Sequence, residues 1–504
     1  MRSLVKRKGA RGALAVGASL AGAALTMGTF AVPAGATLTP PANSTIIGSG
    51  SSTTYNMMIS MDQLFNTSPG CQTFVAFPST TSPQPLDFSC TGPQQATVPE
   101  NPYNDISVQE APLGSSNGIK QLEEQGAHGT ADVNNVANNV AYARSSRALN
   151  PTTGSSAGDF KGLNFVAYAA DAVPWFHYTS INATTPTPSS GVTNLTTAQL
   201  QGVYNGTITN WSTFGGTSAP IVVFSAQEGS GTQSTFKGFL GFDPSAATNP
   251  VNCYTPKGGT KTCVGPAVIF ENEDAQITPA AFAGTQAGFV NNNPQWGATG
   301  KATANGIKKD AIFFFSAGKY ALSCKRPTNC GGSPLHGATN AIGQINSIAA
   351  TEATILEGTF PTDRFLYNVY SNGSNSANIP SATAATLNYV SEDGFICNPN
   401  KGLSTAAVDP LTGLSYISEI QSVIEGNGFY PLSAGRTSGT VNQTEEQEGS
   451  VDTPATTLLN SASGGTGGGL YGYPQYKSFD NDTQSGGQPT GFCLVSTTDG
   501  NSTP

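Results

Sequence analysis

Charged side chains are scarce in this sequence: Asp, Glu, Lys and Arg make up 11% of its 504 residues, where about 25% is usual for soluble proteins. There are three histidines and no Cys-x-x-Cys pair, so the chain has little material for a multi-histidine or cysteine-based metal centre. The net charge of −9 argues against the basic surface that nucleic acids require. We therefore expect no metal, no cofactor and no nucleic-acid partner.

Long apolar runs are also missing after the first residues, so we expect no membrane-spanning helix in the body of the chain. The start itself reads as a secretory signal peptide, with five basic residues before residue 12, a small-residue apolar run and Ala34-Gly35-Ala36. The alternative is a retained membrane anchor, which the short run and the cleavage pattern disfavour. Cleavage after Ala36 removes 36 of 504 residues and five basic charges, which leaves 468 residues and a net charge of −14. We expect the mature protein outside the cytoplasm, secreted or in the cell wall or periplasm.

The cysteines suit that location, because there are eight of them and an even number favours disulfides in an exported chain. Zinc is the alternative, but the closest two cysteines are six residues apart. Many pairings are open to eight cysteines. The pairing that joins neighbours along the chain is Cys71–Cys90, Cys253–Cys263, Cys324–Cys330 and Cys397–Cys493.

Short apolar segments alternate with helical patterns along the chain, which is typical of an α/β sheet protein. The expected strands include 46–47, 164–169, 221–224 and 311–315. The expected helices are 55–65, 119–124, 197–204 and 233–240, each preceded by a Ser or Thr that can cap it. After about Ser438 the composition turns to Gly, Ser, Thr and Gln, which predicts an appendage, although Cys493 suggests that its far end packs on the body.

Three Ser/Thr/Gly clusters lie where strands are expected to pass into helices: 48–54, 114–118 and 228–232. A helix N-terminus presents unpaired N–H groups, glycine allows close approach, and hydroxyls add further donors. Each cluster alone is most simply a structural cap. Three together in one exported chain favour an oxyanion site.

Two charged residues could add to such a site. Arg147, in Arg144-Ser145-Ser146-Arg147, could hold an oxyanion through its guanidinium fork, or it could be a solvated surface arginine. Asp171 stands in an apolar stretch and is either a capped structural acid or an acceptor for a proton on the ligand.

These residues resemble the phosphate-binding proteins of ABC phosphate transporters over roughly residues 45–436. The resemblance rests on 114–122, on 194–211 followed by Gly229-Ser230-Gly231-Thr232, and on the later segments 358–370 and 428–432. It implies a two-lobed, type II periplasmic binding protein of the venus-flytrap kind, with phosphate in the hinge cleft. The implied organisation is a signal peptide at 1–36, lobe 1 at 37–171 and 309–437, lobe 2 at 172–308, and a Gly/Ser/Thr-rich C-terminal extension at 438–504.

The same resemblance implies the ligand contacts. Ser52 and Thr53 match the family's first helix-end pair, Ser115 the second, and Ser230 to Thr232 the third. The sequence departs where the family's arginine falls at Ala226, beside Gln227, and its aspartate falls at Ser146, beside Arg147. Arginine is then supplied by Arg147, and the proton acceptor is Asp171 or another acid. The expected ligand-binding set is Ser51, Ser52, Thr53, Ser115, Ser146, Arg147, Asp171, Gln227, Ser230, Gly231 and Thr232.

The implied protein is a monomeric binding protein, not an enzyme, that takes up inorganic phosphate for an ABC permease. Two other classes stay open. A phosphate-ester hydrolase on the same scaffold is disfavoured because Ser230 does not lie in a G-x-S-x-G turn and no histidine has a recognisable partner. The other open class is a secreted surface or adhesive protein without a small ligand, which the Ser/Thr/Gly-rich tail and the cysteines would also suit.

Overall fold

A computed structural model describes the chain over a series of segments that all belong to one compact unit, Pro40–Pro504. Those segments are 46–68, 96–97, 114–124, 140–148, 162–178, 190–272, 276–277, 279–282, 286–296, 300–320, 340–356, 358–372, 381–391, 394–399, 408–409, 412–432, 477–478 and 493–497. Within them, no helix has the length and apolar character needed to cross a membrane. The predicted signal peptide at 1–36 lies outside the described residues.

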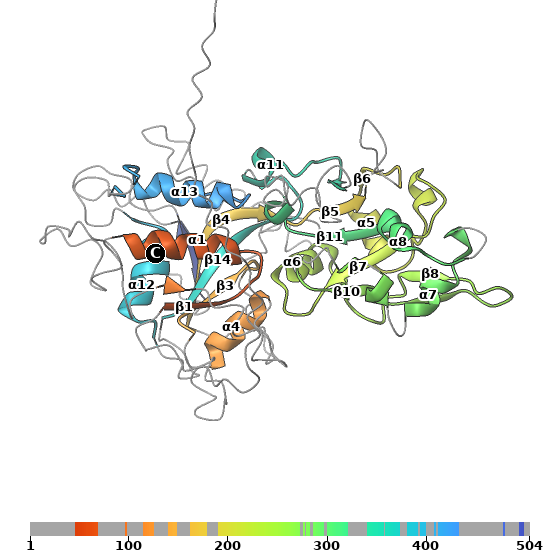
Figure 1. Ribbon diagram of the computed structural model, residues 1–504, viewed down its shortest axis with the longest axis horizontal. Coiled ribbons are helices and arrows are strands. Elements are labelled where there is room, and N and C mark those ends of the chain that lie inside the picture. The colour runs from red at the N-terminus through yellow and green to blue at the C-terminus, as the bar shows by residue number, and fades with distance from the viewer. Residues whose placement is uncertain are drawn as a thin grey trace, which may run out of the picture. The chain divides into compact units, whose positions relative to one another are not determined.

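An eight-stranded sheet forms the first lobe (Figure 1). Its order is β16 (Lys477–Ser478), β17 (Leu494–Thr497), β4 (Leu163–Ala172), β14 (Asp363–Ser371), β3 (Tyr142–Ser145), β1 (Ile46–Gly50) and β2 (Ala96–Thr97), with β15 (Tyr430–Pro431) also paired to β4. Strand β1 runs parallel to β2 and β3, whereas β14 runs antiparallel to β3 and β4. The helices of this lobe are α1 (Tyr55–Thr67), α4 (Ser115–Glu124), α12 (Ala384–Val390) and α13 (Tyr416–Gly426), with α11 (Glu352–Leu356) near β4.

A five-stranded sheet forms the second lobe. Its order is β10 (Ala267–Ile269), β7 (Val222–Ala226), β11 (Ala311–Phe314), β5 (Trp175–Tyr178) and β12 (Asn340–Ile342). The helices around it are α5 (Thr197–Tyr204), α6 (Gly231–Leu240), α7 (Ala287–Asn291) and α8 (Ala304–Asp310), with 3-10 turns at Trp211–Phe214, Pro279–Phe282 and Pro294–Trp296. Two short pairs complete it: β6 (Asn194–Leu195) with β13 (Gln344–Ile345), and β8 (Asn252–Tyr254) with β9 (Thr262–Val264).

The chain crosses between the two sheets twice. It leaves the first sheet after β4, which ends at Ala172, and it returns with β14, which begins at Asp363. Strands β11 and β12 lie after residue 308 and belong to the five-stranded sheet, so this sheet extends beyond the predicted end of lobe 2. The reason is non-local, since β5 pairs antiparallel with both strands.

Local sequence accounts for several of these elements. Helix α5 begins with a capping box in which the Thr196 hydroxyl and the Gln199 side chain satisfy each other's backbone N–H groups. Strand β4 is apolar and buried over nearly its whole length, as expected for a central strand. A core cluster continues through both sheets and includes Phe165 and Tyr367 of the first and Trp211 and Phe314 of the second. The two lobes therefore share part of one hydrophobic core.

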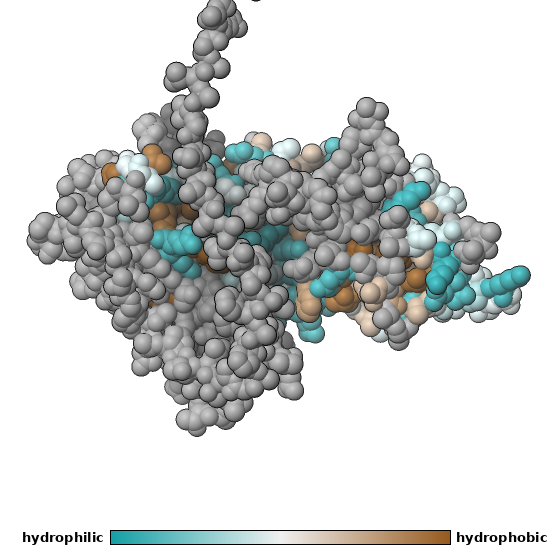
Figure 2. Space-filling view, viewed as in Figure 1, coloured by the Kyte–Doolittle hydropathy of each residue, from teal (hydrophilic) through white to brown (hydrophobic). Residues whose placement is uncertain are grey.

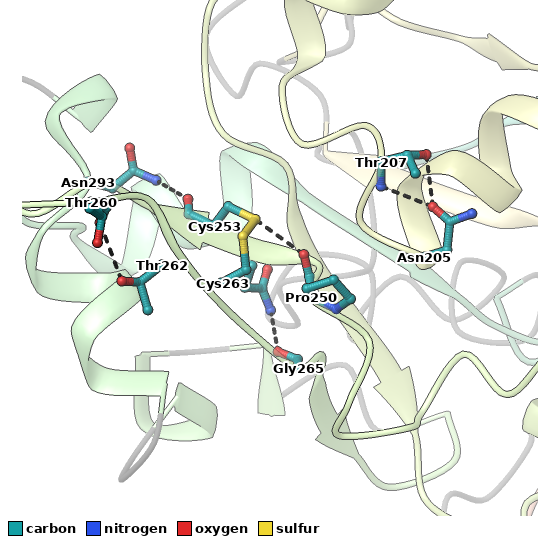
Figure 3. Close-up of a disulfide and its surroundings, with 10 residues drawn as sticks. Asn205, Thr207, Pro250, Cys253, Thr260, Thr262, Cys263, Gly265 and Asn293 are labelled. Carbon is teal, nitrogen blue, oxygen red and sulfur yellow. Dashed lines mark hydrogen bonds between the residues drawn. A yellow bond between two sulfur atoms is a disulfide. The ribbon is translucent and has the colours of Figure 1, made fainter.

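Two of the four predicted disulfides lie within the described residues, and both are present. Cys253–Cys263 joins directly opposed residues of β8 and β9 (Figure 3). The turn between these strands, 257–261, is exposed, and the tip of the hairpin is hydrophilic (Figure 2). Cys397–Cys493 joins the C-terminal part of the chain to the first lobe. The pairs Cys71–Cys90 and Cys324–Cys330 lie outside the described residues.

The far end of the C-terminal extension packs on the body, as Cys493 suggested. Cys493 is fully buried, and β17 pairs with β4 from Leu494 opposite Ala167 to Thr497 opposite Asn164. Most of the remainder of 438–504, including the glycine-rich run, lies outside the described residues.

Candidate oxyanion-binding site

The three Ser/Thr/Gly clusters meet around one hydroxyl, that of Ser146, the residue directly after β3. Ser51, which follows β1, donates to Ser146 Oγ at 2.9 Å, and Ser115 Oγ, at the start of α4, lies 3.2 Å from it. From the second lobe, Thr232 at the start of α6 places its Oγ1 3.5 Å from Thr53 Oγ1. The expectation that three strand-to-helix transitions come together is therefore met.

Glycine is required where the lobes meet. A Cβ added to Gly231 would lie 2.3 Å from both Ser115 Oγ and Ser146 Oγ, well inside van der Waals contact. Residue 231 must therefore be glycine for α6 to approach these hydroxyls. The preceding Ser230 caps α6, because its Oγ accepts from the Gln233 backbone N–H at 3.0 Å.

The group held at this meeting point is the carboxylate of Glu271, which follows β10 and is 2% exposed. Its Oε1 accepts from Thr53 Oγ1 at 2.9 Å and from Ser146 Oγ at 3.2 Å. It also accepts from Thr232, through the backbone N–H at 3.1 Å and Oγ1 at 2.7 Å. Ser52 Oγ donates to Oε2 at 3.3 Å. One oxyanion oxygen is thus bound by four donors from both lobes.

The acceptor of each hydroxyl proton can be assigned, because a hydroxyl carries one proton and these oxygens already accept hydrogen bonds from other groups. Each oxygen also receives a hydrogen bond from elsewhere: Thr53 Oγ1 from Asn272 Nδ2 at 2.9 Å, Thr232 Oγ1 from Arg364 Nη1 at 3.1 Å, and Ser146 Oγ from Ser51. The single proton of each hydroxyl is then left for Glu271 Oε1. This arrangement is complementary to an anion.

Arg364 places a guanidinium at the hydroxyl cluster, in addition to Arg147, to which the sequence pointed. It lies in β14 directly opposite Asp171 of β4, and Nε and Nη2 donate to Asp171 Oδ2 at 3.0 and 2.7 Å. Its Nη1 donates to Thr232 Oγ1 and to the Ser146 carbonyl at 3.0 Å. The available signal in the sequence was an arginine directly before the apolar residues 365–367, because a charge in a buried strand needs a partner.

Asp171 is buried and its oxygens are engaged within the protein. Besides Arg364, Ser316 Oγ donates to Oδ2 at 2.8 Å and the Gly318 backbone N–H donates to Oδ1 at 3.0 Å. Of the two roles left open for Asp171, these contacts favour the structural acid. It orients the arginine that in turn reaches Thr232.

Arg147 and Gln227 lie beside the cluster. Arg147 Nε donates to Ser116 Oγ at 2.9 Å and Nη1 to the Ala148 carbonyl at 2.9 Å, which places the guanidinium against the first turn of α4. The backbone N–H of Gln227 donates to the Ile269 carbonyl at 2.9 Å, next to the segment that bears Glu271. Neither arrangement tests their predicted contact with a ligand.

Arg144 has a different task from Arg147. Its guanidinium donates to the carbonyls of Gly48, Gly50 and Ser51, so it holds the loop that carries the first hydroxyl cluster. Behind it, burial raises the pKa of the Asp62 carboxyl, against the opposing effects of a hydrogen bond from Tyr389 and the Arg144 charge. The loop is thus fixed from within the first lobe.

The described residues of the site offer hydrogen-bond donors rather than a recognisable nucleophile and base. Ser116, at the centre of a G-x-S-x-G sequence at 114–118, accepts from Arg147 and lies in the first turn of α4. His177, the histidine within the described segments, lies in β5 against Trp175. The described residues also contain no group of three or more His, Cys, Asp or Glu that could hold a metal. What they do contain is a set of preorganised donors.

Comparison with known proteins agrees with a binding function for the fold. The family model of a PBP superfamily domain matches residues 80–391, whereas no curated protein matches the chain.

Solved structures similar to the chain include a putative phosphate ABC transporter substrate-binding protein with bound phosphate from Clostridium perfringens. Its sequence is 16% identical, the match covers 77% of this chain and 99% of that chain, and the TM-score is 0.39. An ABC-type phosphate transport receptor from Vibrio cholerae has 18% identity, coverages of 66% and 88%, and a TM-score of 0.34. A phosphate-binding protein from Stenotrophomonas maltophilia has 14% identity, coverages of 77% and 90%, and a TM-score of 0.35. Because the family model matches more than half of the length of this chain, the chain belongs to the PBP superfamily.

Proposed function

We propose that this protein is an exported binding protein that captures inorganic phosphate, a tetrahedral oxyanion, between its two lobes. The observation that carries the proposal is the convergence of Thr53 Oγ1, Ser146 Oγ and both donors of Thr232 on one carboxylate oxygen. A site that binds one oxygen of a carboxylate in this way has the donors needed for an oxygen of phosphate.

Neutral donors suit a buried phosphate because they bind it without bringing a further charged group out of water. The guanidinium of Arg364, which reaches Thr232, is already balanced by Asp171. Local hydrogen bonds in a dry cleft outweigh distant, screened charges, so the acidity of the whole chain does not oppose anion binding. The proposed role needs no metal, no cofactor and no catalytic group.

The family supplies the wider role that we propose: a monomer that delivers phosphate to an ABC permease outside the cytoplasm. The predicted signal peptide supports export, and the two disulfides support an oxidising location. A surface protein without a small ligand is the competing function, and it gives no reason for four donors to be buried around one point.

Calorimetric titration of the mature chain with phosphate, and then with sulfate, tests the proposal. We expect saturable one-to-one binding of phosphate and little or none of sulfate. Thr232→Val should weaken phosphate binding at least tenfold, about 1.4 kcal/mol, because it removes a buried donor. Ser234→Ala, two residues further along α6, is the matched control and should bind as the unaltered protein does. Absence of heat with either anion would refute the proposed function.

A further inference from the structure

Glu271 stands out because it is a buried acid that neutralises no cation among its described contacts. Its carboxylate instead takes the hydroxyls of Ser52, Thr53, Ser146 and Thr232 and the Thr232 N–H. These are the donors on which the proposed phosphate site depends. Each hydroxyl has one proton, and that proton is already given to Glu271.

The segment that carries Glu271 is held in this position by both lobes. Asn272, with a positive φ of 60°, donates to Thr53 Oγ1 in the first lobe and accepts from the Ser316 backbone N–H at 3.1 Å beyond β11. The Ser52 hydroxyl also reaches the Glu271 carbonyl at 3.4 Å. Asparagine is among the few non-glycine residues that adopt a positive φ readily. The turn therefore aims the carboxylate into the site rather than leaving it in solvent.

We propose that the Glu271 carboxylate is an intramolecular ligand of the oxyanion site, which an incoming phosphate must displace. The inference rests on the proposed function, since it assigns a competitor to the same donors. A phosphate oxygen cannot share the Thr53, Ser146 and Thr232 protons with Oε1. A second anion beside an undisplaced carboxylate would also be repelled in a medium that screens charge poorly.

Self-occupancy lowers the apparent affinity by the fraction of molecules whose site is free. If the carboxylate occupies the donors in about 90 to 99% of the molecules, the fraction with a free site is about 0.1 to 0.01, and the apparent dissociation constant for phosphate rises about tenfold to a hundredfold. Glu271 then sets the phosphate concentration at which the protein fills. Because its contacts join the lobes, it also favours contact between them before any ligand arrives.

The opposite role for Glu271 would be that of a ligand contact, accepting the proton of a bound hydrogen phosphate. The two roles predict opposite signs for one substitution. Removal of a competitor tightens phosphate binding, whereas removal of a proton acceptor weakens it.

Calorimetry with phosphate on the full mature chain therefore compares the unaltered protein with Glu271→Ala. We expect at least tenfold tighter binding by the variant. Glu271→Gln, which keeps an oxygen acceptor and removes the charge, should tighten binding by less, and it serves if the alanine variant does not fold. The matched control is Glu352→Ala, an exposed acid at the start of α11, which should leave the affinity unchanged. Weaker or unchanged binding by the folded Glu271 variants overturns the proposal.

Acetate provides a readout that does not depend on phosphate. Once Glu271→Ala empties the donors, a small carboxylate can occupy them, so acetate should raise the melting temperature of that variant more than that of the unaltered protein or of Glu352→Ala at equal ionic strength. Equal shifts in all three proteins overturn the intramolecular ligand. A selective acetate effect without phosphate binding by any of the proteins would uphold it and refute phosphate as the ligand.

Discussion

Two buried carboxylates at this site are stabilised in contrasting ways. Asp171 is paired with the guanidinium of Arg364 and receives two further hydrogen bonds, so its charge is balanced inside the protein. Glu271 instead receives hydroxyl and backbone N–H donors, and no cation pairs with it among the described residues. An ion pair cannot lose one partner without leaving the other charge buried, whereas neutral donors can exchange one oxyanion for another. The first arrangement is a fixed part of the fold, and the second is suited to exchange.

The largest effect should come from breaking the fixed pair. Arg364→Met leaves the Asp171 carboxylate buried without its cation, so we expect the free energy of unfolding to fall by about 3 to 5 kcal/mol. Urea denaturation followed by tryptophan fluorescence measures it. The matched control is Lys237→Met, which removes the cation of the exposed pair with Asp243 and should cost at most about 1 kcal/mol. Similar losses in both variants would mean that the Asp171–Arg364 pair is not the fixed element described here.

A third buried carboxylate, Asp310, sharpens the comparison because it has little of either kind of support. Its Oδ2 accepts from Trp296 Nε1 at 2.7 Å, while Oδ1 has no hydrogen-bond partner among the described residues. Burial raises the pKa of Asp310 from 3.8 to about 6, although the Trp296 hydrogen bond and the Lys309 charge oppose the rise.

The raised pKa of Asp310 determines the direction in which stability changes with pH. A group whose pKa is higher in the folded state stabilises the fold below its unfolded pKa, and that contribution is lost as the pH rises through the folded pKa. Thermal melts should therefore show a loss of stability between about pH 4 and pH 6 that is smaller in Asp310→Asn, which keeps an oxygen for Trp296. At pH 7 the variant should melt at a higher temperature. Parallel pH profiles for the two proteins would contradict this account of Asp310.

The smallest effect is expected from salt. Binding to donors buried between the lobes should change less than about threefold when NaCl rises roughly tenfold, because buried contacts are screened much less than exposed ones. Calorimetric titrations with phosphate at two salt concentrations measure this. A steep loss of affinity would place the anion on the surface and remove the reason for comparing it with Glu271.

The donor clusters could be predicted from sequence because their information is local. Ser115, Thr232 and their neighbours occupy strand-to-helix transitions, where capping residues and glycines identify a helix start. The counterpart residues could not be found in this way. Arg364 reaches Asp171 across 193 positions of sequence, and only the pairing of β14 with β4 brings them together.

Neither the place of Glu271 in the site nor the end of lobe 2 could be predicted from local sequence, and the physical reason is the same. The acids at 271, 273 and 274 stand in one polar segment, and nothing local indicates that Glu271 enters the site. The predicted end of lobe 2 at 308 precedes β11, whose place in the second sheet comes from pairing with β7 and with β5, both distant in the sequence. Which strands become neighbours is decided by the assembled core rather than by any one segment.

Strand β17 has a consequence for the order in which this protein can fold. The edge of β4 from 164 to 170 is completed by β17 and β15, and the Cys397–Cys493 bond lies at the start of β17. The larger sheet thus combines residues 46–50 with residues 494–497, and it remains unfinished until residue 497 has been synthesised. Such long-range pairing slows folding, and until it is complete the open edge of β4 is available to other extended chains.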